Sequence, residues 1–375
     1  MGYARPFDLD AGAPLERVEL PRPESDKLLG LELLRFGSAL AVLVFHYTHF
    51  TYVIGAPEVG RSAWPLYALL WPLYDYGLYG VQIFWGISGY IFFWKYGAAI
   101  RSGAVAAREF FWLRFSRLYP LHLATLVSVI ALQAIHRRVA GADFVYPATD
   151  PGLFVRQLFL ATDWVSQSPF SFNGPIWSIS AEVAVYAAFF ALVRLFAPSI
   201  KLCLGVIGAG LAMQLAGLNW VSIGCATFFF AGGFAALASV EWRRRVAFTL
   251  AALVTGCLAT GIMGDRGKLP TILLVAIPCL LILVSRGWTG LRRWQKPIQA
   301  AGNLTYSSYL LHFPLQLLVA IMVATSGIAL PLTSPLLLIA YIGGTLAIAA
   351  LSYRAFEVPL QSWLRRRTLP LKVSR

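Results

Sequence analysis

Long apolar runs separated by short polar segments make up most of the chain. Ten such runs are 17 to 26 residues long, and none contains more than two charged side chains. An α-helix needs about 20 apolar residues to cross the hydrocarbon of a bilayer. We therefore predict an all-α polytopic membrane protein with about ten transmembrane helices. The predicted spans cover residues 33–50, 71–94, 118–135, 175–196, 202–218, 220–240, 246–263, 269–285, 300–325 and 335–353.

The distribution of positive charge predicts how these spans are oriented. An even number of spans places both termini on one side, and 25 of the 31 Lys and Arg residues then fall on that side. Segments rich in Lys and Arg stay in the cytoplasm. We expect cytoplasmic N and C termini, a disordered cytoplasmic tail at 1–27, a membrane domain at 28–365 and a basic C-terminal tail at 366–375.

Composition narrows the class of protein. The chain is 58% hydrophobic and 13% charged, whereas a soluble domain carries about 25% charge. The net charge is +14, and the positively charged residues cluster between the apolar runs. Contact with lipid headgroups explains this distribution, and no nucleic acid partner is expected. The four cysteines fall inside apolar runs without metal-ligand spacing, and we expect no metal site. The sequence leaves the oligomeric state unknown.

The first span carries a cation near its start, Arg35, and an imidazole near its end, His46. The eleven-residue interval is about three helical turns, or about 16 Å, so both side chains lie on one stripe. Polar groups at such depth face a protein interior or a wet cavity and indicate function. His46 can act as a general base, and Arg35, oriented by Glu32 one turn earlier, can bind an anion. The alternative is an arginine that reaches the interface and a hydrogen-bonded packing histidine.

A basic and aromatic segment precedes the third span. Arg114 and Arg117 lie at i and i+3 and share a helix face, and aromatic residues flank them on both sides. This pattern indicates a cytoplasmic site for a phosphorylated ligand, whose base the aromatics could stack on. The alternative is an interfacial aromatic belt with its usual positive charges.

Glu182 is a carboxylate about two turns inside the fourth span. Ser178 and Tyr186 lie at i−4 and i+4 on its face. A carboxylate inside the bilayer needs a partner or a proton. We expect His46 or an arginine as the partner; the alternative is a protonated structural carboxyl.

Later polar residues are weaker candidates on their own. Tyr309 and His312 lie at i and i+3 in the ninth span, where a lone histidine fits packing as well as chemistry. Glu357 follows the last span and fits a salt bridge or a cap. The segment 86–89 carries two glycines that indicate close helix packing. The long connection 136–173 is a candidate acceptor-binding lid, with an interfacial helix at 153–160.

Six short motifs in order resemble the acyltransferase-3 family of integral membrane O-acyltransferases. The resemblance covers residues 27–365 and departs from the family pattern at Gln82 and Val183. The matching residues are Arg35 and His46 with Glu32, the segment 80–89, Arg114 and Arg117, the group Trp177, Ser178, Ser180 and Glu182, the group Tyr306, Tyr309, His312 and Pro314, and Glu357 with Pro359.

The resemblance implies transfer of an acyl group, often acetyl, from cytoplasmic acyl-CoA to a hydroxyl of a carbohydrate or glycolipid. His46 would be the base, Glu182 would stabilise its imidazolium, and Arg35, Arg114 and Arg117 would hold the CoA phosphates. Acyl-CoA would be a co-substrate, with no permanently bound cofactor. We expect a stand-alone membrane domain in a bacterial inner (cytoplasmic) membrane that modifies the cell envelope or an exopolysaccharide.

Two other classes remain open from the sequence. A transporter or flippase for a glycolipid or acyl carrier would also need buried polar residues and cytoplasmic arginines, although the chain lacks the internal repeats of many transporters. A non-catalytic anchor or sensor would tolerate substitution of Arg35 and His46.

Overall fold

The computed structural model describes residues 28–238, 242–260, 268–285 and 289–369. Within these ranges the regular elements are helices and no strand is present, which confirms the predicted all-α class. The tail predicted at 1–27 and the last residues of the basic tail, 370–375, lie outside the described residues. The predicted boundary at 365 falls inside the final helix, which continues to Thr368.

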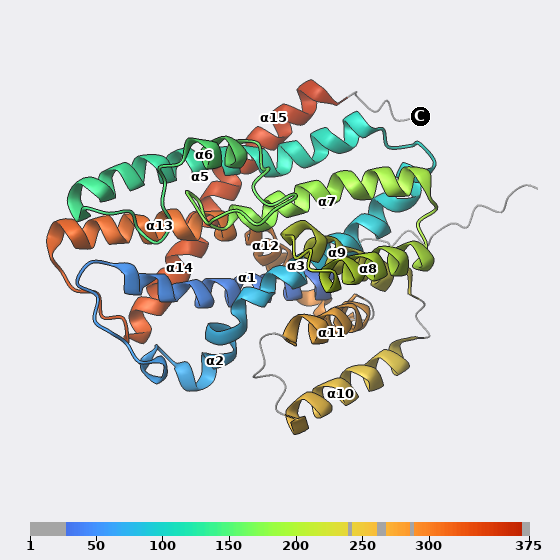
Figure 1. The fold of residues 1–375 in the computed structure, drawn as a ribbon, viewed down its shortest axis with the longest axis horizontal. Helices are drawn as coiled ribbons and strands as arrows, with labels where there is room; N and C mark the ends of the chain where they lie inside the picture. Colours follow the sequence, from blue (N-terminus) through green and yellow to red (C-terminus); the bar gives the residue numbers. More distant parts are fainter. Residues whose placement is uncertain (1–27, 239–241, 261–267, 286–288, 370–375) are drawn as a thin grey trace, which may run out of the picture.

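The helices form an elongated bundle, with α1, α5, α7 and α13 running along its long axis (Figure 1). Their bounds are α1 Leu29–His46, α2 Tyr67–Tyr76, α3 Gly80–Phe92, α4 Ala98–Arg101, α5 Ala107–Ala140, α6 Pro151–Leu158, α7 Ile176–Leu195, α8 Ile200–Leu215, α9 Val221–Leu237, α10 Arg243–Thr260, α11 Leu269–Val284, α12 Gln295–Asn303, α13 Thr305–Ser326, α14 Pro335–Ser352 and α15 Val358–Thr368.

Among the described residues, five helical segments are long and apolar enough to cross a bilayer. They are Leu29–Tyr52, Ala107–Ala140, Ile176–Leu195, Thr305–Ser326 and Pro335–Thr368. Shorter apolar helices cover Ile200–Leu215, Val221–Leu237, Arg245–Cys257 and Leu269–Val284. The chain is therefore a helical membrane protein, while the count of ten spans and the orientation of the termini stay predictions.

The second predicted span, 71–94, is not one helix. α2 and α3 are separated by a 3-10 turn at Gly77–Tyr79, because the backbone presses against α1 at this point. A Cβ on Gly77 would collide with the carbonyl of Ala41, so only glycine allows the approach. Hydropathy alone does not reveal such a break.

The helix that contains the third predicted span, α5, begins before the apolar run at 118–135. α5 is continuous over 34 residues, so the basic segment with Arg114 and Arg117 belongs to the same helix. The connection after it begins at Gly141, whose φ of 78° ends α5 in the left-handed region. The predicted helix at 153–160 is present as α6, capped by the Asp150 side chain, which accepts from the amides of Gly152 and Leu153.

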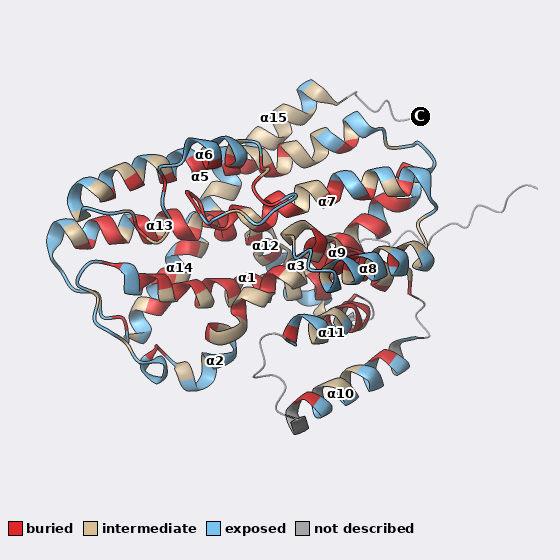
Figure 2. Ribbon diagram, viewed as in Figure 1, coloured by how far each residue is buried: buried red, intermediate tan, exposed pale blue. Residues whose placement is uncertain are grey.

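Close packing between α3 and α9 holds the centre of the bundle. A Cβ on Gly89 would meet the carbonyl of Phe229, and a Cβ on Gly232 would meet the carbonyl of Gly86. Small residues of this kind let membrane helices approach at backbone distance. The close packing predicted for 86–89 is confirmed. Buried residues concentrate along α1, α3, α9 and α13, whereas α8 and α10 are more exposed (Figure 2).

Candidate active site

The start of α1 faces a cavity of about 260 Å³ that four arginines line. Arg35 comes from α1, Arg114 and Arg117 from α5, and Arg365 from α15. Of the residues that line this cavity, only Glu182 is acidic. The remaining lining comes from Val81, Phe84, Trp85, Ile87, Ser88, Ile91, Phe92, Leu118, Ser178, Ile179, Tyr186, Thr305, Tyr306 and Tyr309. We call it the arginine cavity.

The ion pairs of these arginines are long. Arg35 lies 3.8 Å from Glu32, as the sequence predicted for one helical turn. Arg117 lies 3.9 Å from Glu357, whose other oxygen accepts from Ser307. Both distances exceed those of a charge-assisted hydrogen bond, about 2.7–2.9 Å. Both cations therefore keep most of their donors for another anion.

Arg114 has aromatic neighbours in place of a carboxylate. It donates to the hydroxyl of Tyr96 at 2.7 Å, and its guanidinium lies 4.9 Å from the ring centre of Phe92 and 5.9 Å from that of Phe110. Ring faces attract a cation without neutralising it. Its Nε is buried and unpaired among the described residues.

Glu182 belongs to the arginine cavity and not to the histidine at the other end of α1. Ser88 and Tyr186 interact with its carboxyl group, and Arg35 and Arg114 act on its charge. Its Oε1 is buried and has no hydrogen-bond partner in the part of the chain that the structure describes. An arginine, one of the two partners that the sequence allowed, is therefore the one near it.

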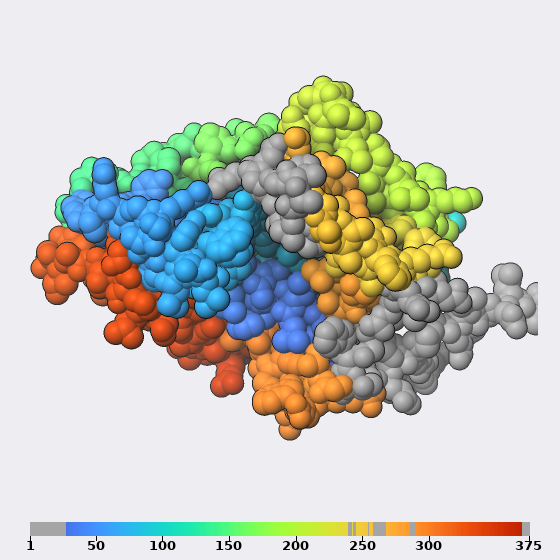
Figure 3. Space-filling view, turned by 90° about the horizontal axis from the view of Figure 1, so that it is seen from below, coloured from blue at the N-terminus to red at the C-terminus, as the bar shows by residue number. Residues whose placement is uncertain are grey.

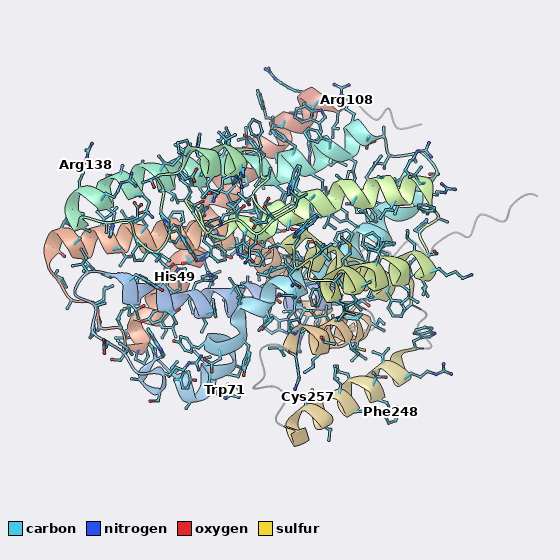
Figure 4. The ribbon with its side chains drawn as sticks, viewed as in Figure 1. His49, Trp71, Arg108, Arg138, Phe248 and Cys257 are labelled. Atoms are coloured by element: carbon cyan, nitrogen blue, oxygen red, sulfur yellow. The ribbon has the colours of Figure 1, made fainter. Side chains whose placement is uncertain are left out.

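Three histidine rings meet beyond the end of α1. The ring centre of His46 lies 4.8 Å from that of His49 and 4.8 Å from that of His312. Figure 4 shows His49 in the interior, between α1 and α13. We call these residues the histidine cluster; no group of His, Cys, Asp and Glu in the described residues has a metal-binding arrangement.

Hydrogen bonds fix which nitrogen of each ring carries the proton. Nδ1 of His46 lies 2.8 Å from the carbonyl of Val42, and Nδ1 of His312 lies 2.8 Å from that of Tyr309. A carbonyl only accepts, so both Nδ1 atoms donate, and in the neutral rings the Nε2 atoms carry the lone pairs. The neutral His46 ring is thus oriented with Nε2 as the base, and Nε2 has no hydrogen bond to any described residue.

Gln316 ties His46 to His49. Its amide nitrogen donates to the carbonyl of His46 at 2.7 Å, and its amide oxygen lies 3.1 Å from Nδ1 of His49. The hydroxyl of Tyr146, from the connection after α5, reaches Nε2 of His49 at 3.3 Å. The connection therefore contacts the cluster, although its predicted role as an acceptor lid stays a prediction.

The structure does not bring every predicted residue into one space. His46 and His312 do not line the arginine cavity, because Tyr309 stands between. The hydroxyl of Tyr309 bonds Ser178 at 2.7 Å and the carbonyl of Pro175 at 3.1 Å. Arg35, Glu182, Ser178 and Tyr309 thus share the cavity. His312 lies beyond the Tyr309 ring, and His46 contacts His312.

Two residues of the Trp-Ser motif have structural contacts. The Trp177 ring packs edge-on against Trp85 at 5.8 Å, and Ser180 donates to the carbonyl of Leu160 at 2.8 Å. These contacts fix α7 against α3 and against Leu160 of the connection after α5. Neither residue lines the arginine cavity.

A second cavity, of about 590 Å³, lies on the opposite face of α1. Figure 3 shows this part of α1 at the surface, beside α2 and α11. Its lining is almost entirely apolar and contains no charged residue, and Trp71, labelled in Figure 4, lies on its α2 side. Its size does not make it the reactive site, because it offers no acid, base or cation.

Sequence reasoning missed His49, Gln316, Tyr146 and Arg365. His49 follows His46 by three residues, a spacing that keeps one helix face, and this was the available signal. Gln316 and Tyr146 are joined to the cluster only by the tertiary fold.

Comparison with known proteins identifies the family of the chain. The family model described as an acyltransferase domain, acyltransferase-3, matches residues 28–354. Acyltransferase MdmB of Streptomyces mycarofaciens is 28% identical over 169 residues, which cover 44% of this chain and 39% of that relative. The chain thus matches well under half of that protein's length. No solved structure matches.

Proposed function

Because the chain belongs to the acyltransferase-3 family and is an O-acyltransferase, we propose that it moves an acyl group from cytoplasmic acyl-CoA to a hydroxyl. Acetyl is the expected group, and a carbohydrate or glycolipid of the cell envelope or an exopolysaccharide is the expected acceptor. We place the protein in a bacterial inner membrane, which the chain would cross ten times with both termini in the cytoplasm.

The observation that carries the proposal is the convergence of Arg35, Arg114 and Arg117 on one cavity. Arginine pairs with phosphate through two parallel hydrogen bonds, and CoA carries a pyrophosphate and a separate 3′-phosphate. The pantetheine arm would then extend along α1 toward His46, about 16 Å from Arg35 for eleven residues of helix.

His46 supplies the proton chemistry in this proposal. Its free Nε2 removes the hydrogen of the acceptor hydroxyl as the oxygen attacks the thioester carbon. The C–S bond then breaks, and the imidazolium returns the proton to the CoA sulfur. General acid–base catalysis of this kind contributes about 10²–10⁴ in rate.

The acyl arm must pass Tyr309 to reach His46. This passage requires the Tyr309 ring to turn, which breaks its bonds to Ser178 and to the Pro175 carbonyl. Two neutral hydrogen bonds contribute about 1–3 kcal/mol together, so binding of the donor can drive the movement.

Release of CoA tests the proposal. Purified full-length protein in detergent is mixed with radiolabelled acetyl-CoA and with carbohydrate and lipid-linked sugar fractions from the native host. We expect thiol release that depends on the acceptor fraction and an acetyl ester on the carbohydrate. Acetyl-CoA that stays intact with every fraction, together with movement of a lipid-linked sugar across vesicles, would favour the flippase alternative.

A further inference from the structure

Three consecutive arginines near the end of α15 have different surroundings. Successive residues of a helix point about 100° apart. Arg365 lines the arginine cavity, Arg366 is exposed, and the guanidinium of Arg367 lies 4.6 Å from the ring centre of Trp363. One of the three therefore belongs to the site, and its neighbours offer matched comparisons.

A buried serine aims Arg365 into the cavity. Nε of Arg365 donates to the hydroxyl of Ser116 at 3.1 Å. Ser116 is 2% exposed and lies on α5 between Arg114 and Arg117. In the part of the chain that the structure describes, no carboxylate lies within salt-bridge distance of Arg365.

The charges around the cavity do not balance. Arg114 and Arg117 both act on the charge of Arg365, and like charges repel. Glu182 is the only acid in the lining. Outside the lining, Glu32 and Glu357 lie 3.8 and 3.9 Å from Arg35 and Arg117, whereas Arg114 and Arg365 have no carboxylate within salt-bridge distance among the described residues. The four cations therefore outnumber the three carboxylates, and a ligand that carries phosphate would supply the missing negative charge.

We propose that Arg365 is a fourth phosphate-binding residue and that α15 forms one wall of the donor site. This inference rests on the proposed function, because the phosphates are those of acyl-CoA. α15 is anchored at its start by Glu357, which bonds Ser307, and near its end by the contact of Arg365 with Ser116. A donor bound by Arg365 and Arg114 joins α15 to α5, which lie side by side in Figure 1.

Binding of CoA to the full chain in detergent tests this assignment by calorimetry. Arg365→Ala should weaken CoA binding about ten- to hundredfold, the usual range for one charge-assisted contact. Arg366→Ala, which removes the same charge from an exposed neighbour, should change affinity less than about twofold. Arg365→Lys should recover part of the loss, and Ser116→Ala should cost about threefold by freeing the side chain.

Two further probes locate the contact. Dephospho-CoA lacks the 3′-phosphate and pantetheine lacks every phosphate, so Arg365→Ala should leave the binding of pantetheine unchanged. Equal losses in the Arg365→Ala and Arg366→Ala variants would overturn the role of Arg365 and leave the donor assignment intact. Wild-type protein that binds no CoA would overturn both.

An experiment in nanodiscs distinguishes the phosphates of CoA from the phosphate of a lipid headgroup as the ligand of Arg365. The wild type and Arg365→Ala are compared in nanodiscs of phosphatidylcholine with and without phosphatidylglycerol. CoA binding that Arg365→Ala weakens equally in both lipids supports the proposal. A loss of phosphatidylglycerol binding with unchanged CoA affinity would assign Arg365 to a headgroup and overturn it.

Discussion

The polar groups at the two ends of α1 differ in how fully their hydrogen bonds and ion pairs are formed. At its start, the arginine cavity contains cations with long ion pairs, 3.8 Å for Arg35 and 3.9 Å for Arg117. At its end, the Nδ1 atoms of His46, His49 and His312 each bond an oxygen at 2.8–3.1 Å. Cations with long ion pairs prepare a site for a charged ligand, whereas rings held through their Nδ1 atoms keep one geometry before any ligand arrives.

This difference predicts different failures. A change in the arginine cavity should act on the affinity for the donor, because its groups complete their bonds only with the ligand. A change in the histidine cluster should act on turnover, because its groups are already placed.

The largest expected effect is that of His46→Ala. Loss of the base should lower turnover about 10²–10⁴-fold and leave the dissociation constant of CoA unchanged. Acceptor-dependent CoA release and calorimetry measure the two quantities. Full activity in a folded variant would remove His46 from the mechanism.

Gln316→Leu should have the next largest effect. It keeps a similar volume but leaves the carbonyl of His46 and Nδ1 of His49 without their partner. An unsatisfied buried group costs about 1–3 kcal/mol, so we expect a lower melting temperature and about a tenfold loss of turnover. Unchanged turnover with a lowered melting temperature would make the bridge structural only.

Glu182→Gln distinguishes the two roles open to this carboxylate. If Glu182 balances the arginines, the variant should bind CoA about threefold more tightly, because a repulsion of less than about 1 kcal/mol at this screening is removed. If it stabilises the His46 imidazolium, as the family resemblance implied, turnover should fall while affinity stays the same. Its position among Arg35 and Arg114 favours the first outcome.

Salt should act at only one end of α1. Raising ionic strength from about 0.1 M to about 1 M shortens the Debye length from about 10 Å to about 3 Å. CoA affinity should fall several-fold, while turnover at saturating donor stays constant. Turnover that falls in parallel would show that the two ends are not separable.

The sequence predicts well the features that depend on local pattern. Apolar runs located the helices, and the interval of eleven residues placed Arg35 and His46 on one stripe of α1. The two glycines of 86–89 predicted close helix packing, which the structure forms with α9. Each of these rests on the periodicity of a single helix.

Features that depend on contacts between distant segments could not be predicted. The bond between Gln316 and the His46 carbonyl joins residues 270 positions apart. Arg365 belongs to a run of three arginines in the sequence, and only the packing of α15 shows that its side chain lines the cavity while that of Arg366 is exposed. The break at Gly77 follows from the position of the Ala41 carbonyl, and the barrier of Tyr309 follows from how α7 meets α13.

The length of α5 has a consequence for where solute and lipid meet. Its 34 residues extend about 51 Å at 1.5 Å per residue, whereas the hydrocarbon layer is about 30 Å thick. Arg108 and Arg138 mark its two ends (Figure 4). The helix is longer than the hydrocarbon is thick, and with the predicted span 118–135 in the hydrocarbon we expect the turns that carry Arg114 and Arg117 at headgroup depth. A water-soluble nucleotide can then dock from the aqueous phase, and only its uncharged thioester arm has to enter the hydrocarbon core.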